Sequence, residues 1–208
     1  MNTKNLLAHI ATCALLITVT HTLADEQSAK TNPAPAKASG AATAVIITTS
    51  AGPITVELWP DKAPMTVSNF LNYVDTEFYN GLIFHRVMDG FMIQGGGFTP
   101  DMQQKEPHPP VKNEARSDTP NARGTIAMAR TPMINSATSQ FFINLVDNEA
   151  LNHRGETRES FGYCAFGKVT AGMDAVDTIA KTPTGDANGH QNVPRTPVLI
   201  ISIKRAGR

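Results

Sequence analysis

Apolar residues in this chain gather into short β-branched and aromatic runs, which are separated by Gly, Pro, Asn and Ser. A run of four to six such residues bounded by turn residues is typical of a β-strand, because most helices are longer. We predict a strand in each of eight segments: residues 44–49, 54–59, 83–87, 91–94, 125–129, 140–145, 164–169 and 198–203. The folded part of the chain is therefore predicted to be mainly β.

Two segments instead repeat their apolar residues every three or four positions, as an amphipathic helix does. The first begins near Pro64 and carries on one face Val67, Phe70, Leu71, Val74 and Phe78. The second is expected to be capped by Thr170 and carries on one face Met173, Val176, Ile179 and Ala180.

Many short strands with only two helices favour a closed or partly closed β-barrel, although this pattern alone leaves a β-sandwich open. A barrel of about eight strands is just wide enough to be filled by its own side chains. We therefore expect the working site on the outside of the barrel. A ligand-binding barrel is the alternative, and it would require an empty lumen.

Residues 1–24 have the features of a secretory signal peptide. Lys4 provides the positive start, residues 10–19 are mostly apolar, and small residues lead to a cleavage site before Asp25. A helix of the folded domain is one alternative. A lipid anchor at Cys13 is another, but the apolar run continues past that cysteine. A signal peptide predicts export to the periplasm.

Residues 25–43 contain no large apolar side chain and are rich in Pro and Ala, so we predict a flexible linker. The folded domain is expected to occupy residues 44–208. Cleavage of the signal peptide would leave Cys164 as the single cysteine, without a partner for an intramolecular disulfide. Its apolar neighbours predict a buried thiol.

The charge of the chain excludes some partners. The formal net charge is zero, so no strong field attracts nucleic acid or an anionic membrane. No apolar stretch reaches 18 residues, so stable membrane insertion is not expected. The six histidines show no ligand-like spacing, so no metal site is expected either.

Three blocks of sequence resemble the signatures of the cyclophilins: residues 84–96 (FHRVMDGFMIQGG), 139–143 (SQFFI) and 161–169 (FGYCAFGKV). The resemblance covers residues 44–205, and residues 124–130 and 191–194 are most similar to the exported bacterial branch. It implies a closed eight-stranded antiparallel β-barrel capped by two α-helices. It also implies peptidyl-prolyl cis-trans isomerase activity on proline-containing polypeptides, without a cofactor, by a protein that acts as a monomer.

The resemblance also implies the residues of a proline-binding groove on the outer wall of the barrel. The catalytic residue by position is Arg86. The residues that would bind substrate are His85, Phe91, Met92, Gln94, Ala129, Arg130, Gln140, Phe142, Leu151 and Tyr163. Strand alternation gives separate support for a binding role of Phe142. It places Phe142 on the polar face of its strand together with Gln140 and Asn144, and an aromatic ring exposed on a polar face needs a functional reason.

The residue types suit X-Pro rotation, which needs neither proton transfer nor a covalent intermediate. An arginine is always charged and offers several rigid donors to a twisted amide. The alternative for Arg86 is a strand arginine that reaches solvent. The alternative for the whole groove is a chaperone that grips proline-containing segments without turnover.

One position departs from the family pattern. Relatives carry an aromatic residue, often Trp, before the leucine that matches Leu151, whereas this chain has Ala150. The loop that follows, residues 152–160, is longer than in short relatives. The only tryptophan, Trp59, lies in an early strand and does not replace the missing ring by sequence position. We therefore do not expect tight cyclosporin binding.

Overall fold

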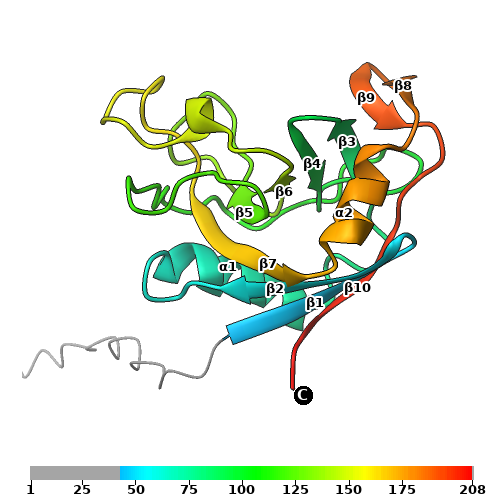
Figure 1. Cartoon of the computed structure of the whole chain (residues 1–208), viewed down its shortest axis with the longest axis horizontal. Coiled ribbons are helices and arrows are strands. Elements are labelled where there is room, and N and C mark those ends of the chain that lie inside the picture. The colour runs from blue at the N-terminus through cyan, green and yellow to red at the C-terminus, as the bar shows by residue number, and fades with distance from the viewer. Residues whose placement is uncertain (1–42, 208) are drawn as a thin grey trace, which may run out of the picture. The chain divides into compact units, whose positions relative to one another are not determined.

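The computed structural model describes residues 43–207 (Figure 1). The predicted signal peptide and nearly all of the predicted linker lie outside the described residues. The helices are α1 (Pro64–Asp75), the 3-10 turn η1 (Glu149–Leu151) and α2 (Met173–Ala180). The strands are β1 (Thr43–Thr49), β2 (Gly52–Leu58), β3 (Phe84–Met88), β4 (Met92–Gly95), β5 (Thr125–Met128), β6 (Phe141–Asn144), β7 (Ala165–Ala171), β8 (Thr184–Ala187), β9 (His190–Pro194) and β10 (Ile200–Arg205).

Eight of the strands form one antiparallel sheet in the order β10-β1-β2-β7-β5-β6-β4-β3. One curved sheet confirms the prediction of a mainly β fold and excludes the β-sandwich. The predicted closure is wrong, because the sheet is an open half-barrel with β10 and β3 at its two ends. Residues 81–84 and 198–200 are joined by the isolated bridge between Ile83 and Leu199 and by a few backbone hydrogen bonds, but no ladder pairs β3 with β10. Pro197 lies just before β10 and has no N–H to donate, which is consistent with a ladder that does not continue here.

All eight predicted strands are present, with boundaries that differ by one or two residues. The structure adds the hairpin of β8 and β9, which pairs separately from the large sheet. Its turn is Asn188-Gly189, and both residues have positive φ, at 49° and 79°. An Asn-Gly pair is a strong sequence signal for a two-residue hairpin turn, so this hairpin was predictable and was missed.

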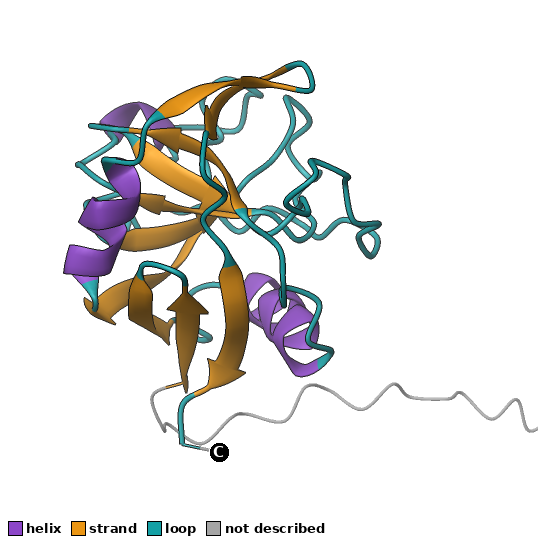
Figure 2. Cartoon of the chain, turned by 90° about the vertical axis from the view of Figure 1, so that its right-hand side faces the viewer, coloured by secondary structure: helices purple, strands orange, loops and turns teal. Residues whose placement is uncertain are grey.

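Both predicted helices are present, and Figure 2 shows them on opposite sides of the strands. The first is shorter than predicted, because α1 ends at Asp75 and Phe78 lies beyond it, after Glu77 with φ +53°. The prediction that Thr170 caps α2 is wrong, because Thr170 still belongs to β7 and Gly172 is the capping residue. Gly172 has φ +86°, and a Cβ there would lie 2.2 Å from the Pro53 carbonyl oxygen. Only glycine meets both conditions, so this turn is decided by backbone packing.

The inside of the curved sheet is filled by one cluster of buried apolar side chains from nearly every strand and both helices. The alternative of a barrel with an empty lumen is therefore wrong. Cys164 belongs to this cluster and is free, as predicted, and burial raises the pKa of its thiol to about 11. Such a thiol is unreactive at neutral pH.

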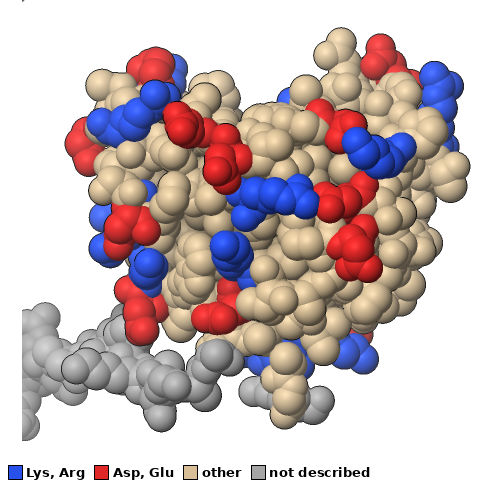
Figure 3. All heavy atoms as spheres, in the orientation of Figure 1, with Lys and Arg blue, Asp and Glu red and all other residues tan. Residues whose placement is uncertain are grey.

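The surface carries charges of both signs. Figure 3 shows Lys and Arg interspersed with Asp and Glu over the face displayed, without a patch of one sign. Among the helices of residues 43–207, none has the length and apolar character needed to cross a membrane. No cluster of His, Cys, Asp or Glu suited to a metal ion occurs within the same residues.

Candidate active site

A row of directly opposed residues crosses the outer face of the sheet. Arg86 on β3 faces Gln94 on β4, Gln94 faces Phe142 on β6, and Phe142 faces Ala127 on β5. Residues opposite one another on neighbouring strands project on the same side of a sheet. The antiparallel register therefore brings together side chains that lie up to 56 positions apart in the sequence.

Arg86 reaches this row because β3 contains a bulge. Phe84 pairs with Gly95 but Arg86 pairs with Gln94, so His85 is an extra residue in the ladder. Strict alternation from Phe84, which is buried in the core, would direct Arg86 to the same inner side. A bulge re-aims side chains in this way and is common next to active sites.

The guanidinium of Arg86 ends a chain of polar groups. The Gln94 amide donates to the Gln140 side-chain oxygen at 2.9 Å, and Arg86 lies 3.5 Å from the Gln94 oxygen and 3.1 Å from the Met88 sulfur. Among residues 43–207, no carboxylate forms an ion pair with Arg86. Because these contacts use few of its donors, Arg86 can bind an incoming carbonyl or amide nitrogen.

Gly97 makes this polar chain possible. A Cβ at Gly97 would lie 2.6–2.7 Å from the side chain of Gln140, closer than real Cβ atoms come. Any larger residue would therefore push Gln140 away from Gln94. The glycines at residues 95–97 therefore allow neighbouring side chains to come close, in addition to allowing the chain to turn.

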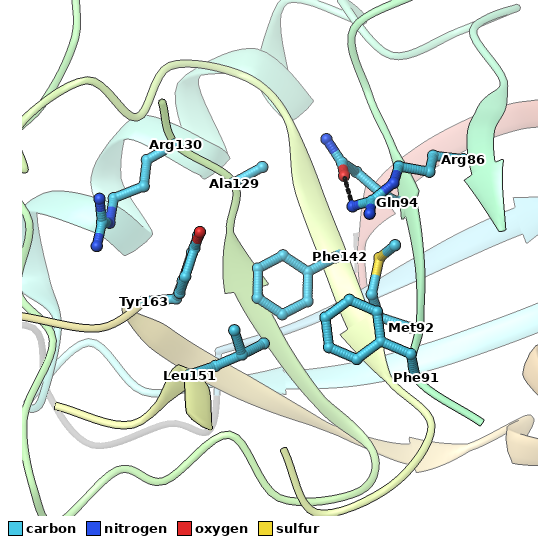
Figure 4. Close-up of a pocket in the computed structure, with 9 residues that line it drawn as sticks. All are labelled: Arg86, Phe91, Met92, Gln94, Ala129, Arg130, Phe142, Leu151 and Tyr163. Carbon is cyan, nitrogen blue, oxygen red and sulfur yellow. Dashed lines mark hydrogen bonds between the residues drawn. The ribbon is translucent and has the colours of Figure 1, made fainter. Parts of the chain in front are cut away.

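An apolar pocket lies beside Arg86 (Figure 4). Its floor is a small outer cluster of buried residues, in which Met92 and Phe142 pack with two alanines, Ala127 and Ala165. The rings of Phe142 and Tyr163 meet edge to face at 5.7 Å. The pocket is lined by Arg86, Phe91, Met92, Gln94, Ala129, Arg130, Phe142, Leu151 and Tyr163.

Arg130 holds the far rim of this pocket. Its guanidinium donates to the carbonyl oxygens of Gly162 at 3.0 Å and of Thr131 at 3.0 Å, with longer bonds to two further carbonyls. It also lies 4.7 Å from the centre of the Tyr163 ring, within the range of a cation–π contact. Arg130 thus ties the loop after β5 to the loop before β7.

Buried asparagines support the same loops. The Asn121 amide donates to the carbonyls of Leu151 at 3.0 Å and Tyr163 at 3.1 Å. The Asn148 amide donates to the Phe91 carbonyl at 2.9 Å and to Asn144 at 2.7 Å. Each asparagine side chain satisfies loop carbonyls that would otherwise be buried without a partner. These supporting residues were not predicted, since no local pattern distinguishes them from surface asparagines.

His85 lies behind Arg86 and is only 4% exposed. Burial, with smaller contributions from His190 and Arg86, lowers the pKa of its imidazole to about 4. His85 is therefore neutral at physiological pH. Its ring packs 4.6 Å from the ring of Phe98.

The structure brings together the predicted groove residues, although it does not by itself assign their roles. Nine of the eleven line the apolar pocket, and the other two, His85 and Gln140, line an adjoining cavity that shares Arg86, Gln94 and Arg130. The prediction that Phe142 is exposed is wrong, because it is 4% exposed beneath the loops of the groove. The unmatched Ala150 is exposed on η1 and does not line the pocket. Trp59 does not line it either, although it packs against the outer cluster.

Comparisons with known proteins show which family the chain matches. Residues 44–205 match the family model described as cyclophilin type peptidyl-prolyl cis-trans isomerase/CLD. Peptidyl-prolyl cis-trans isomerase A of Dickeya dadantii is 53% identical over 170 residues, covering 82% of this chain and 88% of that protein. Peptidyl-prolyl cis-trans isomerase B of Escherichia coli is 54% identical over 155 residues, covering 74% and 94%.

A solved structure supports the same fold. A cyclophilin-type peptidyl-prolyl cis-trans isomerase of Cryptosporidium parvum, crystallised in the presence of the dipeptide Ala-Pro, superposes with a TM-score of 0.68. It is 27% identical in sequence, and the match covers 79% of this chain and 99% of that one.

Proposed function

The chain belongs to the cyclophilin-type peptidyl-prolyl cis-trans isomerases and is an enzyme of that class; we propose that Arg86 and the pocket beside it perform the rotation. The observation that carries this proposal is the cross-strand row of Arg86, Gln94 and Phe142, which puts a free cationic donor beside an apolar pocket. That combination suits an X-Pro unit, which has an apolar ring next to an amide.

The chemistry follows from the electronic structure of the amide. The X-Pro bond resists rotation by about 18–20 kcal/mol because the nitrogen shares its lone pair with the carbonyl. At the twisted transition state this sharing is lost, and the nitrogen lone pair becomes a hydrogen-bond acceptor. A donor from Arg86 then binds the transition state better than either planar isomer, which is the requirement for catalysis.

Arg86 supplies only part of the acceleration. A hydrogen bond to a charged group contributes about 1.5–3 kcal/mol net, which corresponds to a rate factor of roughly 10 to 150. The apolar pocket adds to this, because the twisted amide is less polar than the planar one. Gln94 would orient both the guanidinium and the substrate backbone, since it already contacts Arg86 and Gln140.

The substrates we propose are proline-containing polypeptides. The shape and apolar lining of the pocket support this, as does the Ala-Pro dipeptide used with the Cryptosporidium parvum relative. We propose that the protein acts as a monomer. Cyclosporin should bind weakly, because Ala150 leaves one rim of the groove without an aromatic ring.

We also propose that the protein works in the periplasm on exported chains during their folding. The support is the sequence of residues 1–24, with its basic start, short apolar run and small residues before Asp25, followed by the linker at residues 25–43. Mass measurement of protein from an export-competent cell should give a mature start near Asp25. An intact Met1 would remove the periplasmic assignment.

The catalytic role is tested with a short X-Pro peptide whose cis-trans exchange is followed in the presence of the wild type and of Arg86→Ala. We expect kcat/KM to fall by roughly 10- to 150-fold with little change in Tm, because Arg86 is half-buried and makes no ion pair within residues 43–207. Arg116→Ala is the matched control, since Arg116 is an exposed arginine that pairs with Asp118 and does not line the pocket. Equal loss of Tm and activity in Arg86→Ala would make Arg86 structural.

The same assay separates catalysis from simple binding. A wild-type protein that binds the peptide but leaves its exchange at the uncatalysed rate would be a chaperone that grips proline-containing segments. In that case Arg86→Ala would change the affinity for the peptide but would not change its rate of cis-trans exchange.

A further inference from the structure

A second cavity adjoins the proline pocket on the other side of Arg86. It lies between the outer ends of β3 and β4 and the hairpin of β8 and β9, and we call it the hairpin cavity. It shares Arg86, Gln94 and Arg130 with the proline pocket. Its remaining lining residues are His85, Phe98, Gln140, Gly189, His190, Gln191 and Asn192. A peptide bound across Arg86 would therefore have room for a side chain there.

The walls of the hairpin cavity contain cationic and amide groups and no Asp or Glu. Arg86 contributes a charge that no carboxylate among residues 43–207 neutralises. His190 lies on the same wall and can donate a hydrogen bond from its ring. Because of Arg86, the potential inside the cavity is positive, although the face displayed in Figure 3 carries mixed charges.

The cavity is also held in place by packing. The Phe98 ring lies 4.6 Å from the His85 ring and 5.0 Å from the His190 ring, so it bridges β3 and the hairpin. The tight turn at Asn188 and Gly189 fixes the hairpin itself, and the Asn188 amide donates to the Asp101 carbonyl at 3.3 Å. A preorganised wall of this kind loses little freedom when a ligand binds.

One polar atom in the wall has no partner. Nδ1 of His85 is buried and makes no hydrogen bond within the described part of the chain. Because this atom is out of reach of solvent, it lies behind the surface of the cavity and does not contact a ligand there. The subsite therefore rests on the accessible groups of the wall, which are Arg86, Gln94 and the side chains of the hairpin.

We propose that the hairpin cavity is a second substrate subsite, which takes an acidic side chain from a residue close to the proline. The carboxylate would lie among Arg86, His190 and the amides of the hairpin. The proposal rests on the proposed function, because it assigns a sequence preference to the same groove. It predicts that proline-containing segments with a nearby Asp or Glu are the preferred substrates.

The test is a set of proline peptides that carry Glu, Gln or Lys two residues before, directly before or directly after the proline. Their exchange is measured by NMR, which needs no coupling protease with preferences of its own. At one of the three positions we expect kcat/KM to be about two- to fivefold higher for Glu than for Gln, the size of a solvent-exposed ion pair. Lys should be slower than Gln, and added salt should shrink the difference.

Two variants assign the preference to this cavity. His190→Glu should reverse the order of Glu and Lys, because it puts a carboxylate into the wall. Thr184→Glu is the matched control, since it adds the same charge to the same hairpin at a residue that does not line the cavity. The control should keep the wild-type order.

The outcomes separate the two levels of the proposal. Equal rates for Glu and Gln at every position, or an unchanged order in His190→Glu, would overturn the acidic subsite while leaving the isomerase function intact. No acceleration of an all-alanine reference peptide would overturn the proposed function, and the subsite with it.

Discussion

The inner and outer faces of the sheet are built from alternating residues of the same strands but serve different purposes. On β6, Phe141 and Ile143 point into the filled interior, whereas Phe142 points to the outer cluster beneath the groove. On β5, Ile126 is part of the interior and Ala127 is part of the outer cluster. Alternation therefore assigns stability to one face and binding to the other, within segments of four residues.

The difference lies in side-chain size. The interior is packed with large rings, such as the edge-to-face pairs that Phe141 makes with Phe70 at 5.7 Å and with Tyr79 at 5.5 Å. The outer cluster places two alanines, Ala127 and Ala165, beside Phe142 and Met92. Small residues on the outer face leave space that a substrate ring can occupy, while the inner face leaves none.

The strongest test of this comparison removes two neighbouring rings on β6, one at a time. Phe141→Ala should destabilise the fold by about 3–5 kcal/mol, because it removes a fully buried ring and leaves a closed cavity. Phe142→Ala should cost only about 1.5–3 kcal/mol, because the space that it leaves opens onto the groove. Urea unfolding measures both values, and the isomerase assay should show a raised KM for Phe142→Ala at temperatures where it is folded.

Equal destabilisation by the two changes would mean that the outer cluster is as much a core as the interior. An unchanged KM in folded Phe142→Ala would remove Phe142 from the proline pocket.

The second test uses pH. The pKa of His85 falls from 6.5 unfolded to about 4 in the fold, so the unfolded chain binds more protons between these values. Its contribution to stability is complete above pH 6.5 and is progressively lost as the pH falls through about 4. We expect about 3 kcal/mol of stability to be lost between pH 7 and pH 4 for this reason.

Urea unfolding of the wild type and of His85→Gln at pH 7 and pH 4 measures that loss. The variant should lose about 3 kcal/mol less than the wild type over this range. Parallel losses in both proteins would show that other groups, such as surface carboxylates, cause the whole pH dependence.

The third test concerns the rim of the outer face. Arg130→Lys keeps the charge but loses the planar group that donates to several carbonyls and lies over Tyr163. We expect KM to rise about threefold to tenfold, equivalent to about 1 kcal/mol, with Tm changing by a few degrees. Arg123→Lys is the control, because it replaces an arginine that bonds to Asp177 away from the groove. A similar change in KM in both variants would contradict a specific role for Arg130.

The smallest effect on activity is expected at the position that departs from the family pattern. Ala150→Trp adds an aromatic ring next to Leu151 at the edge of the pocket, and we expect cyclosporin to bind about tenfold more tightly. Isothermal titration with wild type and variant measures this. Activity on a small peptide should change less than twofold, because Ala150 does not line the pocket. An unchanged affinity would mean that the missing ring at Ala150 does not limit cyclosporin binding.

The sequence by itself determined the class of the fold and much of the groove. Short bounded runs predicted all eight strands of the sheet, and the 3.6-residue period predicted both helices, because these signals are local. The block around Arg86 pointed to the groove through its resemblance to the cyclophilins. The Asn-Gly turn of the hairpin was equally local and could have been read from the sequence.

Only the tertiary structure decided which side of the sheet each groove residue faces. Alternation counted from Phe84 would have turned Arg86 into the core, and the bulge at His85 reversed it. Likewise Phe142, predicted to be exposed, is buried because loops from distant parts of the chain cover it. A bulge and a covering loop depend on pairing with residues far away in the sequence, and a local pattern carries no record of that pairing.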